Sequence, residues 1–131
     1  MVLLLRICLK NLLFLERTDL MSGNYDVVIV GAGPAGIFTA LELAEQSDLD
    51  LIILEKGRDI QNRDCPKKTQ GTDCVKCENC SIVCGWGGAG AYSDGKLTLS
   101  PEIGGNLDEY IGKEKLVELI SYADQKYCQF G

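Results

Sequence analysis

Residues 25–57, YDVVIVGAGPAGIFTALELAEQSDLDLIILEKG, constrain the fold more than any other part of this 131-residue chain. The apolar, β-branched run at residues 25–30 is typical of a central strand that is buried on both faces of a parallel sheet. Apolar residues then recur at helical spacing, which predicts a helix with one face on the sheet. These residues are Ile37, Ala40, Leu41 and Ala44. A second apolar run at residues 51–54 predicts another strand, so the order is strand, turn, helix and strand.

A glycine turn (residues 31–36) with the spacing G-x-G-x-x-G joins the first strand to the helix. Its glycines are Gly31, Gly33 and Gly36. The first allows a tight turn, the second lets the backbone approach a pyrophosphate, and the third lets the helix pack on the strand. Pro34 suits the first helical turn, whose free N–H groups face the phosphates. Glu55 ends the second strand, where its carboxylate can accept hydrogen bonds from ribose hydroxyls. The sequence therefore predicts a bound dinucleotide.

The fold class that follows is α/β, a Rossmann-like FAD/NAD(P)-binding βαβ unit with an incomplete parallel sheet. Only one such unit is evident, whereas a dinucleotide-binding sheet needs further parallel strands. We therefore expect residues 21–131 to be the N-terminal part of a nucleotide-binding domain in a longer enzyme. An apolar stripe near the C-terminal end predicts a helix that needs a surface to bury against. The stripe comprises Leu116, Ile120, Ala123, Tyr127 and Phe130.

The composition excludes several classes of function. A net charge of −6 argues against nucleic acid as a partner, because a phosphate backbone is bound by surplus Lys and Arg. The chain has no His, which excludes His-based acid–base catalysis and His metal ligands within it. Within residues 1–20 the longest apolar run is too short to span a bilayer, and the segment has neither the continuous apolar centre nor the small-residue cleavage site typical of a secretory signal. We expect a cytoplasmic protein whose partner is a small-molecule redox substrate.

Residues 1–20, MVLLLRICLKNLLFLERTDL, precede the position where a nucleotide-binding protein would naturally begin, at Met21. We interpret them as an N-terminal extension that arises from an early start codon. Arg6 and Lys10 lie one helical turn apart among leucines, so an amphipathic helix that binds a membrane surface or a partner is an alternative. A targeting signal is the third interpretation.

Five of the seven cysteines fall within residues 65–84, which we treat as a Cys-rich insertion. The segment CVKCENCSIVC has the spacing C-x2-C-x2-C-x3-C of bacterial iron–sulfur ligands, although Gly85 follows it where ferredoxins have proline. The candidate ligands are Cys74, Cys77, Cys80 and Cys84. Three alternatives are open: an iron–sulfur cluster, in which Cys65 can replace one ligand, a structural zinc, and free or redox-active thiols. A disulfide framework is not expected, since nothing marks the chain as secreted.

A second glycine segment (residues 85–99), GWGGAGAYSDGKLTL, directly follows the cysteines. Trp86 and Tyr92 among its glycines favour an ordered backbone that lies against a cofactor over a flexible surface loop. Asp94 and Lys96 are predicted to form a solvated pair on a turn rather than a catalytic pair.

These motifs together resemble a known family. YDVVIVGAGPAGIFTALELA, then LIILEKG, then C-P-x7-C-x2-C-x2-C ahead of GWGGAGAYSDGKLTL, resembles the N-terminal portion of the uncharacterised FAD-dependent dehydrogenases, which are related to the glutathione-reductase-like and fumarate-reductase-like flavoproteins. The resemblance covers residues 21–131 and implies FAD, with its pyrophosphate at the glycine turn, its adenosine ribose on Glu55, and the second glycine segment along the cofactor. The implied cofactor-binding residues are Gly31, Ala32, Gly33, Pro34, Ala35, Gly36, Glu55, Lys56, Gly87, Gly88, Ala89 and Gly90.

The residues alone do not distinguish FAD from NAD, because both bind the same glycine turn and acid. Glu55 does argue against NADP, since its charge would repel a 2′-phosphate. We expect the FAD-binding portion of a flavin-dependent oxidoreductase. The alternatives are an NAD-binding dehydrogenase fragment and a non-catalytic module that binds a cofactor or metal. No catalytic residue can be assigned.

Overall fold

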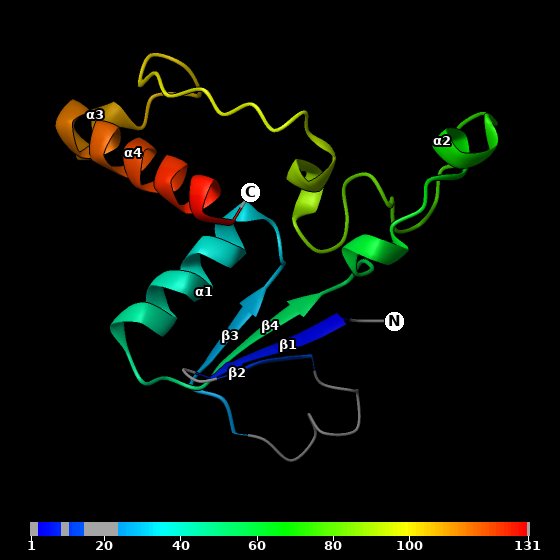
Figure 1. The fold of residues 1–131 in the computed structure, drawn as a ribbon, viewed down its shortest axis with the longest axis horizontal. Coiled ribbons are helices and arrows are strands. Elements are labelled where there is room, and N and C mark those ends of the chain that lie inside the picture. The colour runs from blue at the N-terminus through cyan, green and yellow to red at the C-terminus, as the bar shows by residue number, and fades with distance from the viewer. Residues whose placement is uncertain (1–2, 9–10, 15–23, 131) are drawn as a thin grey trace. The chain divides into compact units, whose positions relative to one another are not determined.

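The computed structural model describes residues 3–8, 11–14 and 24–130, which form two compact units, Met1–Ser93 and Asp94–Gly131 (Figure 1). The strands of the first unit are β1 (Leu3–Cys8), β2 (Asn11–Phe14), β3 (Val27–Val30) and β4 (Leu51–Glu55). Among its described residues the helices are α1 (Pro34–Gln46), α2 (Pro66–Gln70) and two short 3₁₀ helices, Ile60–Asn62 and Gly88–Tyr92. The second unit contains α3 (Asp108–Ile111) and α4 (Lys113–Phe130).

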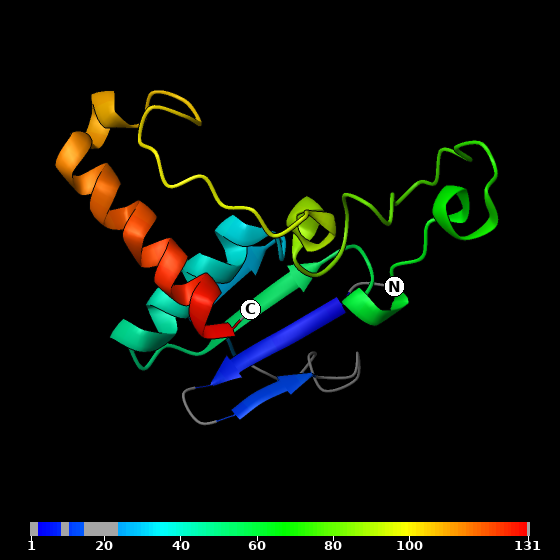
Figure 2. The ribbon, with the colours of Figure 1, turned by 45° about the horizontal axis from the view of Figure 1, so that its top comes forward.

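The βαβ unit that the sequence predicts is present. β3 and β4 pair in parallel, with Val27 opposite Leu51, and α1 connects them across one face of the sheet (Figure 2). Ala40 of α1 and Ile53 of β4 are buried in one core cluster with Ala32 of the glycine turn. The local apolar patterns were therefore sufficient to predict this part of the fold.

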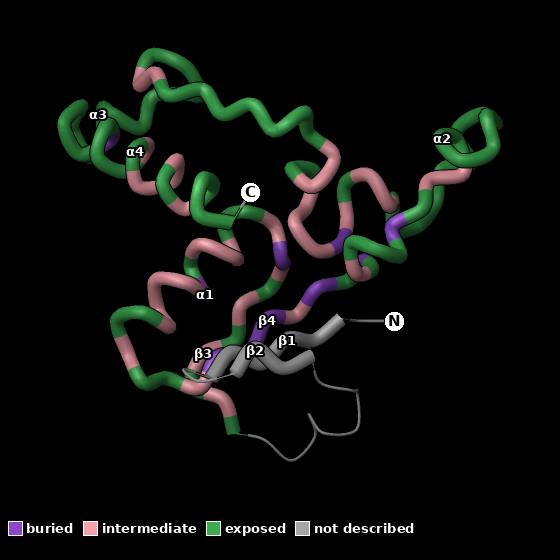
Figure 3. Tube along the Cα trace, viewed as in Figure 1, coloured by how far each residue is buried: buried purple, intermediate pink, exposed green. Residues whose placement is uncertain are grey.

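The position of β3 in the sheet differs from the sequence prediction. The strand order is β2-β1-β4-β3, so among the described strands β3 lies at an edge and is not central. Its Val28 and Val30 side chains are 52% and 83% exposed. The prediction that residues 25–30 are buried on both faces is wrong, because Ile29 packs against the core cluster while Val28 and Val30 alternate with it along the strand and lie on the opposite, exposed face. The buried strand is β4, whose Ile52 is only 2% exposed (Figure 3).

The N-terminal residues that the structure describes belong to the same sheet. β1 pairs antiparallel with β4, and β2 pairs antiparallel with β1. The alternative of an amphipathic helix is therefore wrong for residues 3–8 and 11–14. The physical reason is that the parallel pair leaves the second edge of β4 with unpaired backbone groups, which β1 satisfies. The rest of residues 1–20 lies outside the described residues, and the boundary at residue 20 stays a prediction.

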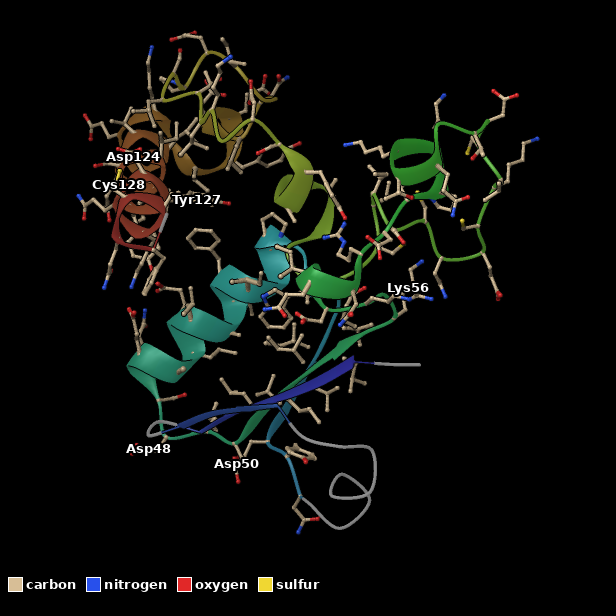
Figure 4. The ribbon with its side chains drawn as sticks, turned by 45° about the vertical axis from the view of Figure 1, so that its right-hand side comes forward. Asp48, Asp50, Lys56, Asp124, Tyr127 and Cys128 are labelled. Carbon is tan, nitrogen blue, oxygen red and sulfur yellow. The ribbon has the colours of Figure 1, made fainter. Side chains whose placement is uncertain are left out.

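The second unit confirms the predicted C-terminal helix, α4. Within the predicted stripe Leu116 is buried, whereas Tyr127 and Phe130 are largely exposed. Cys128 Sγ lies 4.0 Å from Asp124 Oδ1 on the same helix (Figure 4). None of the helices in the described part of the chain is long and apolar enough to span a bilayer.

The pair predicted at the start of this unit is also present. Lys96 Nζ lies 2.9 Å from Asp94 Oδ2, and both side chains are exposed. An exposed pair of this kind contributes little to stability.

Candidate nucleotide-binding site

The glycine turn has the geometry that its sequence predicts. Gly31 adopts a φ of +103°, a conformation that favours glycine, and its N–H donates to Leu54 O at 2.7 Å. A Cβ on Gly36 would lie 2.0 Å from Gly31 O, so only glycine allows α1 to approach the strand end this closely. A Cβ on Gly33 would meet no atom within 4 Å. The space beside Gly33 is therefore open for a ligand.

The N-terminus of α1 is suited to an anion. Gly33 is the N-cap, Pro34 is the first helical residue, and the first turn contains no acidic side chain. The first N–H groups of a helix lack intrahelical acceptors, and the helix dipole adds partial positive charge there. This end of α1 can hold a phosphate group.

Glu55 links three backbone segments through its carboxylate. Oε2 accepts from the N–H of Ala32 at 2.8 Å, in the glycine turn. Oε1 accepts from Gly57 N–H at 2.8 Å and from Gly85 N–H at 2.9 Å. The side chain is buried, with Glu55 6% exposed. Sequence reasoning proposed only a ribose ligand at this position and missed the structural role.

The pKa of Glu55 reflects this environment. Burial raises the pKa of the carboxyl group. The three backbone N–H donors, together with the charge of Lys56, outweigh burial and leave the pKa below its ordinary value of 4.5. The carboxylate is therefore charged at neutral pH. A carboxylate has about four acceptor positions, and the described residues fill three of them, so one stays available for a further donor.

The second glycine segment lies against the glycine turn. Gly87 N–H donates to Ala32 O at 2.8 Å. A Cβ on Gly88 would lie 3.1 Å from Gly33 Cα and 3.4 Å from Pro34 Cδ. Gly87 and Gly88 have φ values of +81° and +59°, which favour glycine at both positions. The structure thus brings together two segments whose contacting residues, Ala32 and Gly87, are 55 positions apart in the sequence.

The remaining predicted cofactor residues lie around this contact. Gly90 is exposed, and a Cβ there would lie 3.7 Å from Pro34 Cγ. Ala35 and Ala89 are exposed. Lys56 is exposed beside the end of β4 (Figure 4). The assignment of all these residues to a cofactor stays a prediction.

Arg63 organises the second glycine segment, and sequence reasoning did not identify it. The residue is 3% exposed. Its guanidinium donates to the carbonyls of Ser81, Ile82 and Trp86 at 2.9, 2.9 and 2.6 Å. The guanidinium also lies 4.8 Å from the centre of the Tyr92 ring, and the Tyr92 hydroxyl donates to Arg63 O. No sequence motif marks this role, because all the acceptors are backbone carbonyls.

The Cys-rich insertion is mostly at the surface. Cys74, Cys77 and Cys80 are exposed, whereas Cys65 and Cys84 are half-buried, and all five are free thiols. Across the residues that the structure describes, no three His, Cys, Asp or Glu side chains are grouped so as to hold a metal ion. The four predicted ligands are thus not brought together, and the metal site stays a prediction.

Comparison with known families identifies the family of this chain. Residues 25–108, which include both glycine segments, match the model of the family described as pyridine nucleotide-disulphide oxidoreductase. The chain belongs to this family. Members of the pyridine nucleotide-disulphide oxidoreductase family share a Rossmann-like FAD/NAD(P)-binding domain, which confirms the predicted fold class and the resemblance to FAD- or NAD-dependent oxidoreductases.

The curated relatives that this chain matches are longer proteins. It is 39% identical over 105 residues to an uncharacterized protein of Clostridium beijerinckii, covering 74% of this chain and 19% of that protein. It is 31% identical over 109 residues to a digeranylgeranylglycerophospholipid reductase of Methanosarcina mazei, covering 75% and 25%. It is 45% identical over 42 residues to a mitochondrial electron transfer flavoprotein-ubiquinone oxidoreductase of Oryza sativa, covering 28% and 7%.

The chain spans at most a quarter of the length of these relatives. No solved structure matches it. The family and the relatives identify a flavin- or nucleotide-binding portion of an oxidoreductase.

Proposed function

We propose that this chain is the FAD-binding portion of a flavin-dependent oxidoreductase that acts on a small-molecule redox substrate. The observation that carries the proposal is the contact between the two glycine segments, where Gly88 lies against Gly33 and Pro34. Two glycine-rich backbone segments that meet beside the N-terminus of a helix provide a surface along which a long cofactor can lie. The relatives named as a reductase and as a flavoprotein-ubiquinone oxidoreductase support redox chemistry of this kind.

The residues of this chain would bind and orient the cofactor. The pyrophosphate would accept hydrogen bonds from the first turn of α1, beside the open space at Gly33. The adenosine ribose would donate to the remaining acceptor position of Glu55. Bound FAD would supply the redox chemistry of its isoalloxazine ring, while the protein supplies binding and electrostatics.

The proposal is tested by titrating purified protein with FAD and with NAD and by recording its visible absorption. We expect yellow protein that binds FAD, and a Gly33→Val variant that binds it at least about 100-fold more weakly, because two lost hydrogen bonds to the pyrophosphate cost about 3 kcal/mol. Gly33 has a φ of −77°, and a Cβ there meets no protein atom within 4 Å. The added side chain should therefore obstruct the ligand rather than the fold.

The matched control is Thr39→Val, because Thr39 is exposed on the same helix. This variant should bind FAD as the wild type does. Colourless protein that binds NAD in preference to FAD would contradict the proposal. So would a Gly33→Val variant that holds FAD as tightly as the wild type.

A further inference from the structure

The buried side chain of Arg63 connects the cysteine turn (residues 80–84) to the second glycine segment. The proposed function assigns no role to this connection. Nε donates to Ser81 O and Nη2 to Ile82 O, both inside the cysteine turn. Nη1 donates to Trp86 O in the second glycine segment. One guanidinium thus fixes the backbone on both sides of Gly85.

The backbone next to these carbonyls is tied to the glycine turn. Gly85 N–H donates to Glu55, and Gly87 N–H donates to Ala32 O. A Cβ on Gly85 would lie 2.7 Å from Arg63 Cδ, so the arginine packs directly on this glycine. A displacement of Arg63 would therefore move the segment that lies against Gly33.

Arg63 also holds the cysteine turn through its carbonyls. The N–H groups of Val83 and Cys84 both donate to Cys80 O, at 3.0 and 2.7 Å. The carbonyls of Ser81 and Ile82 point instead to Arg63. The turn is therefore closed by its own hydrogen bonds and held in place by the guanidinium.

The chemistry of these contacts requires arginine. A guanidinium has five N–H donors in a planar fork, whereas a lysine ammonium is a compact charge that cannot match three carbonyls in the same directions. Burial of a charge among neutral carbonyls is costly, which argues that Arg63 contributes more than packing. Tyr92 covers one face of the guanidinium and donates to the main chain of the same residue.

We propose that Arg63 is a positioning residue of the cofactor site, which holds residues 85–88 against the glycine turn and couples cofactor binding to the cysteine turn. The inference rests on the proposed function, because it assumes a ligand at the glycine turn. Coupling is reciprocal: a ligand that stabilises residues 85–88 also stabilises residues 80–84. The reactivity of the half-buried Cys84 thiol then reports on cofactor binding.

The test compares wild type, Arg63→Lys and Tyr92→Phe. Lys67→Met is the matched control, because it removes an exposed cation from the neighbouring Cys-rich insertion. FAD and ADP are titrated against each protein. Alkylation of individual cysteines by iodoacetamide is followed by mass spectrometry with and without each ligand. Exposed Cys74 serves as the internal reference, and thermal unfolding confirms that each variant is folded.

We expect both ligands to slow alkylation of Cys84 in the wild type and in Lys67→Met, while Cys74 stays equally reactive. Arg63→Lys should bind both ligands at least about tenfold more weakly, because its ammonium cannot hold all three carbonyls. It should also alkylate faster at Cys84 without ligand and lose the protection by ligand. Tyr92→Phe keeps the ring but removes the hydroxyl, so it should weaken ligand binding and speed alkylation of Cys84 less than Arg63→Lys does. If Arg63→Lys does not fold, Tyr92→Phe takes its place in the test.

A folded Arg63→Lys variant that binds FAD as the wild type does would overturn the inference and leave the proposed function intact. Unchanged reactivity of Cys84 in the folded variant would overturn it as well. Wild-type protein that binds ADP but not FAD would contradict FAD as the cofactor. It would leave the role of Arg63 open to the same test, because ADP would then serve as the ligand whose binding is coupled to Cys84. Wild-type protein that binds neither ligand would overturn both.

Discussion

Replacement of Glu55 by glutamine should destabilise the first unit by about 2–4 kcal/mol, a value that follows from the contacts of its carboxylate. The glutamine oxygen can still accept from the N–H groups of Gly57 and Gly85, which share Oε1 in the wild type. The amide NH₂ would then face the N–H of Ala32, a donor against a donor. A buried N–H without an acceptor costs about 1–3 kcal/mol, and loss of the negative charge weakens the other two bonds by about half.

The same carboxylate predicts a dependence of stability on pH. The folded pKa of Glu55 lies below the ordinary value of 4.5, so the contribution of this group is fully present above pH 4.5. It is lost as the pH falls through the folded pKa, because protonation removes the charge that the N–H groups stabilise. The Glu55→Gln variant should lack this part of the pH dependence. The difference in stability between the two proteins should therefore shrink as the pH falls below 4.5.

The assay is urea unfolding followed by circular dichroism at pH 7 and at a series of acidic pH values. Glu78→Gln is the matched control, since Glu78 is exposed and should leave both stability and its pH profile unchanged. A Glu55→Gln variant with the wild-type unfolding midpoint at pH 7 would refute the reasoning. A gap between the two proteins that stays constant at all pH values would refute the part that concerns the charge.

Three further predictions concern other parts of the chain. Gly36→Ala should unfold at a clearly lower temperature than Gly33→Ala. A Cβ on Gly36 would lie 2.0 Å from Gly31 O, whereas a Cβ on Gly33 would meet no atom within 4 Å. Equal melting temperatures of the two variants would count against the observed turn. If the cysteine spacing holds an iron–sulfur cluster, anaerobically purified protein should contain iron and acid-labile sulfide, and Cys77→Ser should lose both; zinc without sulfide, or neither metal, would support the structural zinc or the free thiols. Because β3 lies at an edge of the described sheet and Val30 is exposed, we expect the protein to self-associate through this edge. Val30→Lys should then reduce the self-association measured by light scattering, and unchanged scattering would argue against association through β3.

The features that were predicted correctly depend on contacts that are local in the sequence. Gly31, with its φ of +103°, and Pro34, at the start of α1, follow from the conformational preferences of single residues. The helices α1 and α4 follow from apolar residues at helical spacing. The parallel pairing of β3 with β4 follows from the short helical connection between them. A reader of the sequence alone has all the information that these elements require.

The positions of β1 and β3 in the sheet were not predicted, because they depend on which strand edges pair in the folded protein. β3 was expected at the centre of a sheet, but among the described strands it is at an edge. β1 was not expected to be a strand, although it pairs along β4. An apolar run in a sequence shows that a strand can be buried, but it does not show which neighbour pairs with which edge.

The βαβ unit, the glycine turn and the carboxylate at the end of β4 could all be predicted from the order of the residues. The hydrogen-bond partners of that carboxylate and the role of Arg63 became evident only once the chain was folded. Glu55 accepts from Gly85, thirty residues further along the chain. Arg63 donates to two carbonyls near the end of the Cys-rich insertion and to one just after it. Sequence does not reveal these partners, because every residue except proline has the same backbone N–H and every residue has the same carbonyl. The path of the folded chain therefore decides which backbone group lies next to a buried charge. The residue types in the sequence do not show it.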